Sequence, residues 1–305
     1  MTLTIDGLRG TLSTVVDEEV GVPRETGPTI ARWQLGRQLK SLREAASMTQ
    51  VQIADVLGCS ESKIYKIESG DVGIGRGDLL VMLDRYKVSD DGHREAILDL
   101  QQQGRQRGWW SRYGQLSNSY ATYVGLEAAA TTVRNFELAV MPGLLQTEEY
   151  ARVIISASRP SNDAETERHL RLRMERQKRL DDDPPLNYWT ILDESVLHRE
   201  TGSREVMREQ LRHLIEMSKR SNVTVQVLPY SEGWHPGTLG SFNILEFPED
   251  VHSPVVYTET LAGDAYLERQ EEIGRVSLTY THLHAAALSA TKSRELIAAV
   301  ARDLA

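Results

Sequence analysis

Cysteine is almost missing from this chain of 305 residues, which contains only Cys59. A single cysteine excludes an internal disulfide and offers no second thiol to a metal ion, so we expect a reducing compartment and no metal. Long apolar runs are also missing, because no stretch approaches the ~20 residues that a membrane-spanning helix needs. The acidic N-terminus lacks the pattern of a signal peptide. We therefore expect a cytoplasmic protein that does not engage a membrane.

Positive charge is scarce overall, since the formal net charge is −9, but it is concentrated in one segment. Between residues 32 and 66 the basic residues outnumber the acidic ones; they are Arg32, Arg37, Lys40, Arg43, Lys63 and Lys66. An acidic remainder discourages indiscriminate binding to phosphate, while a locally basic face can still engage it. The charge pattern favours a nucleic-acid partner for this segment.

Residues 49–70 have the spacing of two short helices joined by a tight turn. Thr49 and Ser60 are suited to cap the first and second helix, and Gly58 stands where a helix end favours a left-handed residue. The inward stripes should be Ile53, Val56 and Leu57 in the first helix, and Ile64 and Ile67 in the second. This pattern predicts a helix-turn-helix whose second helix is presented to DNA. The alternative is a helical hairpin that is simply packed core.

The second helix has an outward side that would meet the major groove of DNA. Its residues are Glu61, Ser62, Lys63, Tyr65 and Lys66. The loop that follows contains alternating glycines, but it lacks the preceding strand and the Gly-Lys-Ser/Thr ending of a nucleotide-binding loop. Arg76 in this loop is either a phosphate contact or an exposed arginine without a role.

Helical patterns over residues 33–46 and 78–86 flank this hairpin, and the whole resembles the phage-repressor-like (XRE) helix-turn-helix family. The resemblance is carried by Thr49-Gln50, Ile53-Ala54, Gly58, Ser60, Ser62, Ile64, Ile67-Glu68 and Gly70. It implies an all-α domain with Gln50 and Ser60 near phosphates. It also implies that Glu61, Ser62 and Lys66 face base edges, while Lys63 serves either purpose. The candidate DNA-binding residues are thus Thr49, Gln50, Ser60, Glu61, Ser62, Lys63, Tyr65, Lys66 and Arg76.

Three regions are predicted along the chain. Residues 1–29 mix Thr, Gly, Pro and acidic residues without a period, so we expect a flexible extension. Residues 30–104 contain the helix-turn-helix. Glycines around basic residues at 104–110 mark a domain boundary, so residues 105–305 should form a second domain.

The second domain mixes strand and helix patterns. Strands are expected near residues 131–140, 188–192, 223–228, 241–247 and 255–260. Helices are expected near residues 148–157, 162–180, 203–219, 268–288 and 293–304. The short connections look antiparallel, and we expect an α+β domain.

This second domain resembles the C-terminal domain of actinobacterial antitoxin-like (WhiJ-type) regulators. The similar segments are Met141–Arg152, Leu192–Arg199, Arg208–Glu216, Val223–Pro229, Gly240–Phe247 and Ala287–Ile297. The most specific phrase is Pro-Gly-Leu-Leu-Gln-Thr followed by Tyr-Ala-Arg. In that family an XRE domain precedes this one, and the proteins act together with a small partner protein encoded by an adjacent gene. The resemblance implies a regulator without identifying its signal.

Side chains with catalytic potential form no recognisable active site. Asp193 and Glu194 are neighbours at a strand end and point to opposite faces, which disfavours an acid–base pair. His282 and His284 lie two apart on a helix, which disfavours zinc. His235 lies in a loop without a nucleophile motif and is expected at the surface or at the lip of a ligand site. We expect no enzymatic activity, no catalytic residue and no cofactor.

Two clusters have alternative interpretations. The basic residues of the 162–180 helix most often form a solvated face, with a second nucleic-acid site or a docking site for an acidic partner or a second subunit as alternatives. They are Arg168, Arg171, Arg173, Arg176, Lys178 and Arg179. The aromatic residues after the boundary favour core packing over a small-molecule pocket, because no convergent polar groups are visible beside them. They are Trp109, Trp110, Tyr113, Tyr120 and Tyr123.

These patterns together predict a sequence-specific transcriptional regulator that binds a double-stranded DNA operator as a homodimer and is nucleoid-associated when bound. Its C-terminal domain is expected to bind a partner protein or a small-molecule effector. The alternative is an antitoxin-like protein that binds a small protein encoded by an adjacent gene and autoregulates their operon. A third hypothesis is an enzyme with a DNA-binding appendage.

Overall fold

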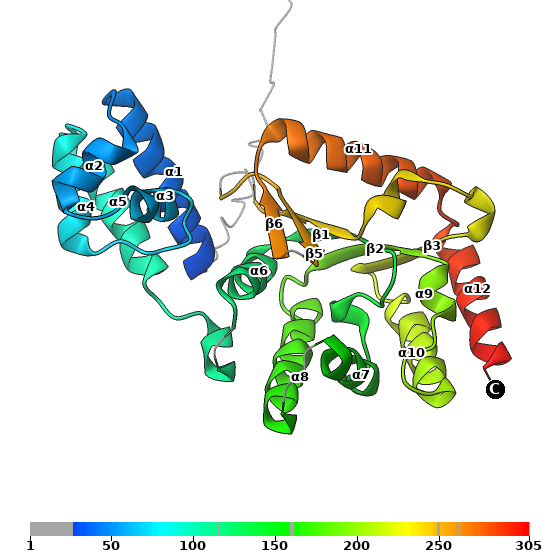
Figure 1. Ribbon diagram of the computed structural model, residues 1–305. Coiled ribbons are helices and arrows are strands. Elements are labelled where there is room, and N and C mark those ends of the chain that lie inside the picture. Colours follow the sequence, from blue (N-terminus) through cyan, green and yellow to red (C-terminus); the bar gives the residue numbers. More distant parts are fainter. Residues whose placement is uncertain (1–26, 115, 159–161, 249–250, 262, 305) are drawn as a thin grey trace, which may run out of the picture.

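The computed structural model describes residues 27–114, 116–158, 162–248, 251–261 and 263–304. Figure 1 shows a helical N-terminal region beside a larger region built on a sheet. Most of the extension predicted over residues 1–29 lies outside the described residues. Its last two residues are helical, because the first helix begins at Pro28, a residue whose fixed φ suits the first turn of a helix.

The N-terminal region is all-α, as predicted. Its helices are α1 (Pro28–Ala45), α2 (Gln50–Leu57), α3 (Glu61–Glu68), α4 (Arg76–Arg85) and α5 (Asp91–Gly104). Thr49 and Ser60 cap α2 and α3 through their side chains, and Gly58 ends α2 with a φ of 61°. The predicted stripe of α2 was wrong in part, because Ile53 and Ala54 are buried while Val56 and Leu57 are only half-buried.

The C-terminal region contains, among the described residues, a sheet of six strands in the order β3-β2-β1-β4-β5-β6. The strands are β1 (Thr132–Glu137), β2 (Asn187–Asp193), β3 (Val223–Leu228), β4 (Phe242–Glu246), β5 (Val255–Thr260) and β6 (Gly263–Leu267). The antiparallel expectation was wrong for β1, β2 and β3, which pair in parallel, whereas β4, β5 and β6 are antiparallel. The α-helices between β1, β2 and β3 provide the crossovers that parallel pairing requires.

Helices cover both faces of the sheet (Figure 1). One face packs beneath α6 (Asn118–Ala129), α7 (Glu148–Ser158), α8 (Asp163–Gln177), α10 (Arg204–Met217) and α12 (Ala290–Asp303), and the other beneath α11 (Gln270–Ala286). Val133 and Phe136 of β1 point to opposite cores, as the alternation of a strand requires. The α+β prediction is confirmed, although α6, the short α9 (Ser195–His198) and β6 were not predicted. Within the described part of the chain, every helix is too short or too polar to cross a bilayer.

Helix α1 takes part in the packing of both regions. Ile30 and Trp33 in its first turns belong to the core beneath the sheet, whereas Leu35 and Leu39 belong to the core of the helix-turn-helix. The Trp33 ring meets the edge of the Tyr266 ring on β6 at a centroid distance of 5.8 Å. One helix therefore connects the two hydrophobic cores.

Candidate nucleic-acid interface

Helix α3 presents a continuous polar face to solvent. Every outward residue predicted for it is exposed: Glu61, Ser62, Lys63, Tyr65 and Lys66. Ile64 and Ile67 are buried in the core of the N-terminal region, as predicted. Tyr65 is 60% exposed although it is aromatic, so it contributes apolar surface that a partner can cover.

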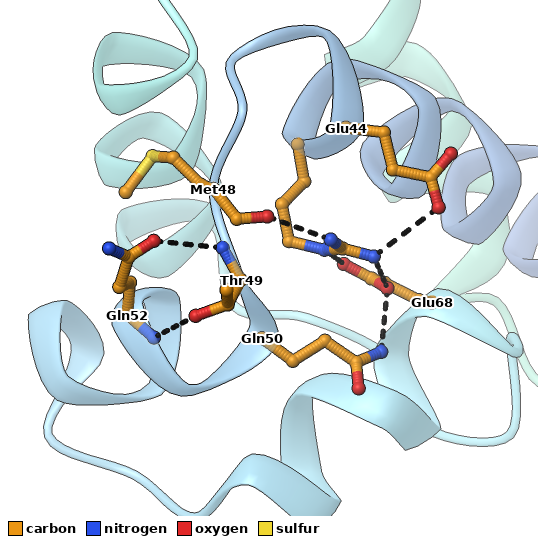
Figure 2. Close-up of polar contacts among 7 residues, drawn as sticks. Glu44, Met48, Thr49, Gln50, Gln52 and Glu68 are labelled. Atoms are coloured by element: carbon orange, nitrogen blue, oxygen red, sulfur yellow. Dashed lines mark hydrogen bonds and ion pairs between the residues drawn. The ribbon is translucent and has the colours of Figure 1, made fainter.

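A buried ion pair fixes the position of α3 relative to α1. The Arg43 guanidinium donates from Nε to Glu68 Oε1 at 2.6 Å and from Nη2 to Oε2 at 3.0 Å. Gln50 Nε2 donates to the same Oε2 at 2.8 Å, so α2 joins the network, as Figure 2 shows. Hydrogen bonding to Glu68 raises the pKa of Arg43 above its usual value. The network thus connects all three helices around the turn.

The ion pair corrects the predicted basic face, because Arg43 is buried and its charge is neutralised by Glu68. A close approach of backbones accompanies it: a Cβ atom added to Gly36 of α1 would lie 2.5 Å from the carbonyl oxygen of Glu68. Only glycine allows this approach. The Ile67-Glu68 pair was visible in the sequence as a motif, but nothing there identified Arg43 as its partner.

The remaining positive charge near α3 comes from three exposed residues, Lys63, Lys66 and Arg76. Lys63 Nζ lies 3.5 Å from Asp78 Oδ2 in a pair that is nearly half exposed. Within the described residues no carboxylate lies at ion-pair distance from Lys66 or Arg76, and both side chains are exposed. These two cations are therefore the most available for phosphate or base contacts.

The predicted residues at the helix N-termini are held by capping contacts. The Thr49 hydroxyl accepts from the Gln52 amide at 3.2 Å, and the Gln52 side chain accepts from the Thr49 amide at 2.9 Å (Figure 2). The Ser60 hydroxyl accepts from the Lys63 amide at 3.3 Å. Gln50 is half-buried by its bond to Glu68. Contacts of these residues with phosphates stay a prediction.

In the C-terminal region the structure gives Asp193 and Glu194 different partners and brings Asp193 next to His235. Asp193 Oδ2 lies 3.2 Å from His235 Nε2, whereas Glu194 accepts from the Tyr230 amide at 2.7 Å. The expectation that His235 lies at the surface was wrong, because it is buried against Asp193 and the edge of the Phe136 ring. A buried imidazole is stabilised by such a carboxylate partner.

The two histidines of α11 also go to different environments. His284 is half-buried and meets the edge of the Trp189 ring at a centroid distance of 4.6 Å, whereas His282 is exposed. Their separate surroundings follow from the two-residue spacing on a helix.

The basic residues predicted for the 162–180 helix do not form one solvated face, which corrects the favoured interpretation. The structure divides them between α8, which ends at Gln177, and a 3-10 turn over Lys178–Leu180. Arg176 is buried and makes two bonds of 2.7 Å to the Glu127 carboxylate of α6. Arg179 is buried and donates to the carbonyl oxygens of Ala128 and Ala130. Arg168 and Arg171 are exposed. Bidentate acceptors make burial of the guanidinium groups possible.

The aromatic cluster divides between core and cavity. Trp110 is buried against Val124 and Leu172, as core packing predicts. Tyr120 and Tyr123, however, line a cavity of about 360 Å³ in which polar side chains do converge. The expectation that polar groups were missing beside these rings was therefore wrong. The polar groups come from α8 and from the sheet, which are distant in sequence.

Residues 34–96 match the family described as "Helix-turn-helix domain", so the exposed face of α3 belongs to a class of domain that binds DNA. Residues 120–299 match the family described as "Domain of unknown function (DUF5753)". The chain belongs to this second family, whose match covers more than half of its length. Comparison with curated proteins and with solved structures found no match.

Proposed function

We propose that this protein is a sequence-specific transcriptional regulator that binds operator DNA through α3, as a homodimer in the cytoplasm. The observation that carries the proposal is the exposed polar face of α3, held in place by the buried Arg43–Glu68 pair. One recognition helix reads too few bases to select a site in a genome. Two copies reading half-sites about one DNA turn apart, ~34 Å, provide that selectivity.

The residues of the interface have separate roles in this proposal. Glu61, Ser62 and Lys66 read base edges, because they project from the exposed side of α3. Phosphate contacts come from the N-termini of α2 and α3 and from Arg76, which is the first residue of α4 and does not lie in the predicted loop, and Lys63 or Tyr65 supplements either group. The phosphate-contacting residues are Thr49, Gln50, Ser60 and Arg76.

The C-terminal domain regulates this DNA binding in the proposed function. Helix α1 supports such a role, because Trp33 packs in the core beneath the sheet while Leu39 packs beside α3 in the N-terminal core. An effector or partner protein that prefers one position of α1 changes operator affinity, and DNA reciprocally changes the affinity for that ligand.

A second candidate function is that of an antitoxin-like protein that binds a small protein encoded by an adjacent gene. One observation favours it: the segment after β3 exposes three large apolar side chains, Tyr230, Trp234 and Leu239, of which Trp234 is 78% and Leu239 is 90% exposed. Exposed aromatic and aliphatic side chains close together in a chain are typical of protein-binding surfaces.

Genome-wide mapping of bound DNA, followed by affinity measurements on the site found, tests the leading proposal. Lys66→Ala or Ser62→Ala should weaken binding to that site by ~1–3 kcal/mol and change binding to random DNA little. Lys219→Ala, on an exposed pair in the other region, is the matched control and should bind as the unmodified protein does. Equal losses on both DNAs would reassign Ser62 and Lys66 to phosphate contacts, and a monomer on a single half-site would contradict the dimer.

The second candidate is tested by mixing the purified adjacent gene product with the full chain. We expect a complex that Trp234→Ala weakens and that Trp234→Phe largely preserves, because the apolar ring is retained. A complex that requires the α3 face instead would mean that the partner occludes the DNA surface directly.

A further inference from the structure

A cavity of about 360 Å³ lies between the sheet and helices α6, α7 and α8. It is large enough for a small molecule. Its apolar wall comes from Met141, Ile154 and Ile155, and its aromatic wall from Tyr123 and Tyr257. Charged and polar side chains from several elements also line it: Glu137, Gln146, His169, Arg173, Arg176, Asn243, Glu259 and Asp264. Polar groups that converge beside an apolar wall are typical of a ligand pocket rather than of a packed core.

Arg173 of α8 lines this cavity without a carboxylate partner among the described residues. Its Nη1 donates to the neutral Gln146 Oε1 at 2.6 Å, and its buried Nε has no hydrogen-bond partner in the described part of the chain. Burial lowers the pKa of Arg173 below its usual value. Its neighbour Arg176 pairs with Glu127 and donates to the Tyr120 hydroxyl at 2.7 Å, so Arg173 is the arginine of this cavity without an ion-pair partner among the described residues.

Glu137 provides an acidic group in the same cavity, at the carboxyl end of β1. It accepts from Asn135 Nδ2 at 3.1 Å but forms no ion pair with a described residue. Burial raises the pKa of its carboxyl group to about 7, although hydrogen bonds from Asn135 and Ser241 and the positive charge of Arg173 act in the opposite direction. Glu259 and Asp264 add acidic groups to the same wall.

Arg173 and Glu137 thus share a cavity without neutralising each other. Both groups are costly to keep buried and unpaired. A guanidinium offers paired donors that fit a carboxylate, and a carboxylate accepts well from an ammonium group. A ligand that carries both charges would satisfy both residues, whereas a ligand with one charge would leave the other residue unpaired.

We propose that this cavity binds a small zwitterion with an apolar side chain, of the chemical class of a free amino acid, with its carboxylate on Arg173 and its ammonium group on Glu137. Tyr123, Tyr257 and the aliphatic wall contact the apolar side chain. The volume of the cavity exceeds that of one branched aliphatic side chain, so an amino acid of the size of leucine fits with room for ordered water.

The proposal deepens the proposed function, on which its regulatory meaning rests, by assigning a class to the effector. A chain of ring contacts leads from the cavity to α1. Centroids of Tyr123 and Tyr257 are 4.3 Å apart, those of Tyr257 and Tyr266 5.2 Å, and those of Tyr266 and Trp33 5.8 Å. A ligand that moves the Tyr257 ring therefore acts on side chains packed directly against α1.

Calorimetric titration of the full chain tests the site. The probes are L-leucine, L-methionine and L-phenylalanine, and, for leucine, its two singly charged analogues 3-methylbutylamine and 4-methylpentanoate. We expect at least one amino acid to bind, and its singly charged analogues to bind about 10-fold more weakly or worse. Arg173→Met and Glu137→Gln should each weaken that binding about 10-fold or more. Arg171→Gln changes an exposed arginine of the same helix and should leave binding unchanged.

The outcomes separate this proposal from the DNA-binding function. If no amino acid binds, or if Arg173→Met and Glu137→Gln remain folded and bind as the control does, the assignment is overturned. If 4-methylpentanoate binds as tightly as leucine, the role of Glu137 is wrong. Operator binding by the free chain is measured in parallel, so loss of the regulator proposal and loss of the zwitterion site are distinct results.

Discussion

Each of the two regions buries one bidentate arginine–glutamate pair, but the two pairs serve different architectures. Arg43 and Glu68 connect α1 to α3 in a tightly packed bundle, and the outward side chains of α3 remain exposed on its outer surface. Arg176 and Glu127 connect α8 to α6 beside a cavity, where the neighbouring Arg173 has no carboxylate partner among the described residues. The same interaction thus positions the proposed DNA-binding face in one region and the wall of the proposed ligand site in the other.

The comparison teaches that a buried ion pair defines geometry more than it adds stability. Desolvation offsets most of the attraction between two buried charges, so the pair is valuable because only one arrangement of the helices satisfies it. For α3 that arrangement leaves five outward side chains exposed to solvent, and for α8 it holds Arg173 against the cavity.

Removing one member of either pair should have the largest effect on stability. Glu68→Ala and Glu127→Ala should each lower the free energy of unfolding by about 3–5 kcal/mol, because an arginine is left buried and uncompensated. Urea unfolding followed by far-ultraviolet circular dichroism measures the loss. Lys219→Ala, which breaks an exposed pair with Glu216, should change stability by less than about 1 kcal/mol. Losses as small as this control would show that the buried pairs do not hold their helices.

The unpaired acid of the cavity, Glu137, should make stability depend on pH. Glu137 has a usual pKa of 4.5 and a pKa of about 7 when folded. Below the lower value both states are protonated, and between the two only the unfolded chain loses its proton. The contribution of Glu137 to the free energy of unfolding therefore falls as pH rises from 4.5 to 7, by about 3 kcal/mol, and is constant above.

Glu137→Gln removes this titration. Relative to the unmodified protein, the variant should gain stability between pH 4.5 and 7 and show no further gain at higher pH, measured as the difference in urea midpoints. Arg173, Glu259, Asn135 and Ser241 act on the same carboxyl group and are unchanged in both proteins. A difference that does not vary with pH would mean that Glu137 titrates normally in the folded chain.

Loss of a helix N-cap should have the smallest effect on stability, and it tests whether the cap of α2 also matters for DNA binding. Thr49→Ala and Ser203→Ala each remove an N-cap, of α2 and of α10, and should each cost about 1 kcal/mol of stability. Only Thr49→Ala should also weaken binding to operator DNA, because α2 supports α3. Fluorescence anisotropy on a labelled operator checks this, and equal DNA affinities of the two variants would argue against a role for the α2 N-terminus.

Short-range pattern was enough to predict the helix-turn-helix. The caps at Thr49 and Ser60, the left-handed Gly58 and the buried Ile64 and Ile67 all depend on neighbours within a few residues. The outward face of α3 followed from the same period. Strand and helix patterns also predicted the α+β class, because alternation and helical spacing are local properties.

Arrangements that join distant segments were not predictable in this way. Asn135 and Asn243 are register partners across β1 and β4 although 108 positions separate them, and β1, β2 and β3 run parallel against expectation. The alternation of apolar and polar residues along a strand shows which of its faces is buried, but not which other strand it pairs with. The charges of Arg43 and Arg176 look the same in sequence whether they are solvated or buried.

The cavity and the double role of α1 depend on this long-range packing. Tyr123, Glu137 and Arg173 lie on α6, β1 and α8, and nothing in their local sequence indicates that they share one space. Ile30 and Leu39 fall on one amphipathic helix, yet they pack in different cores. A residue's neighbours along the chain determine its helix or strand, whereas its contacts in space depend on how every element packs, because burial is a property of the whole fold.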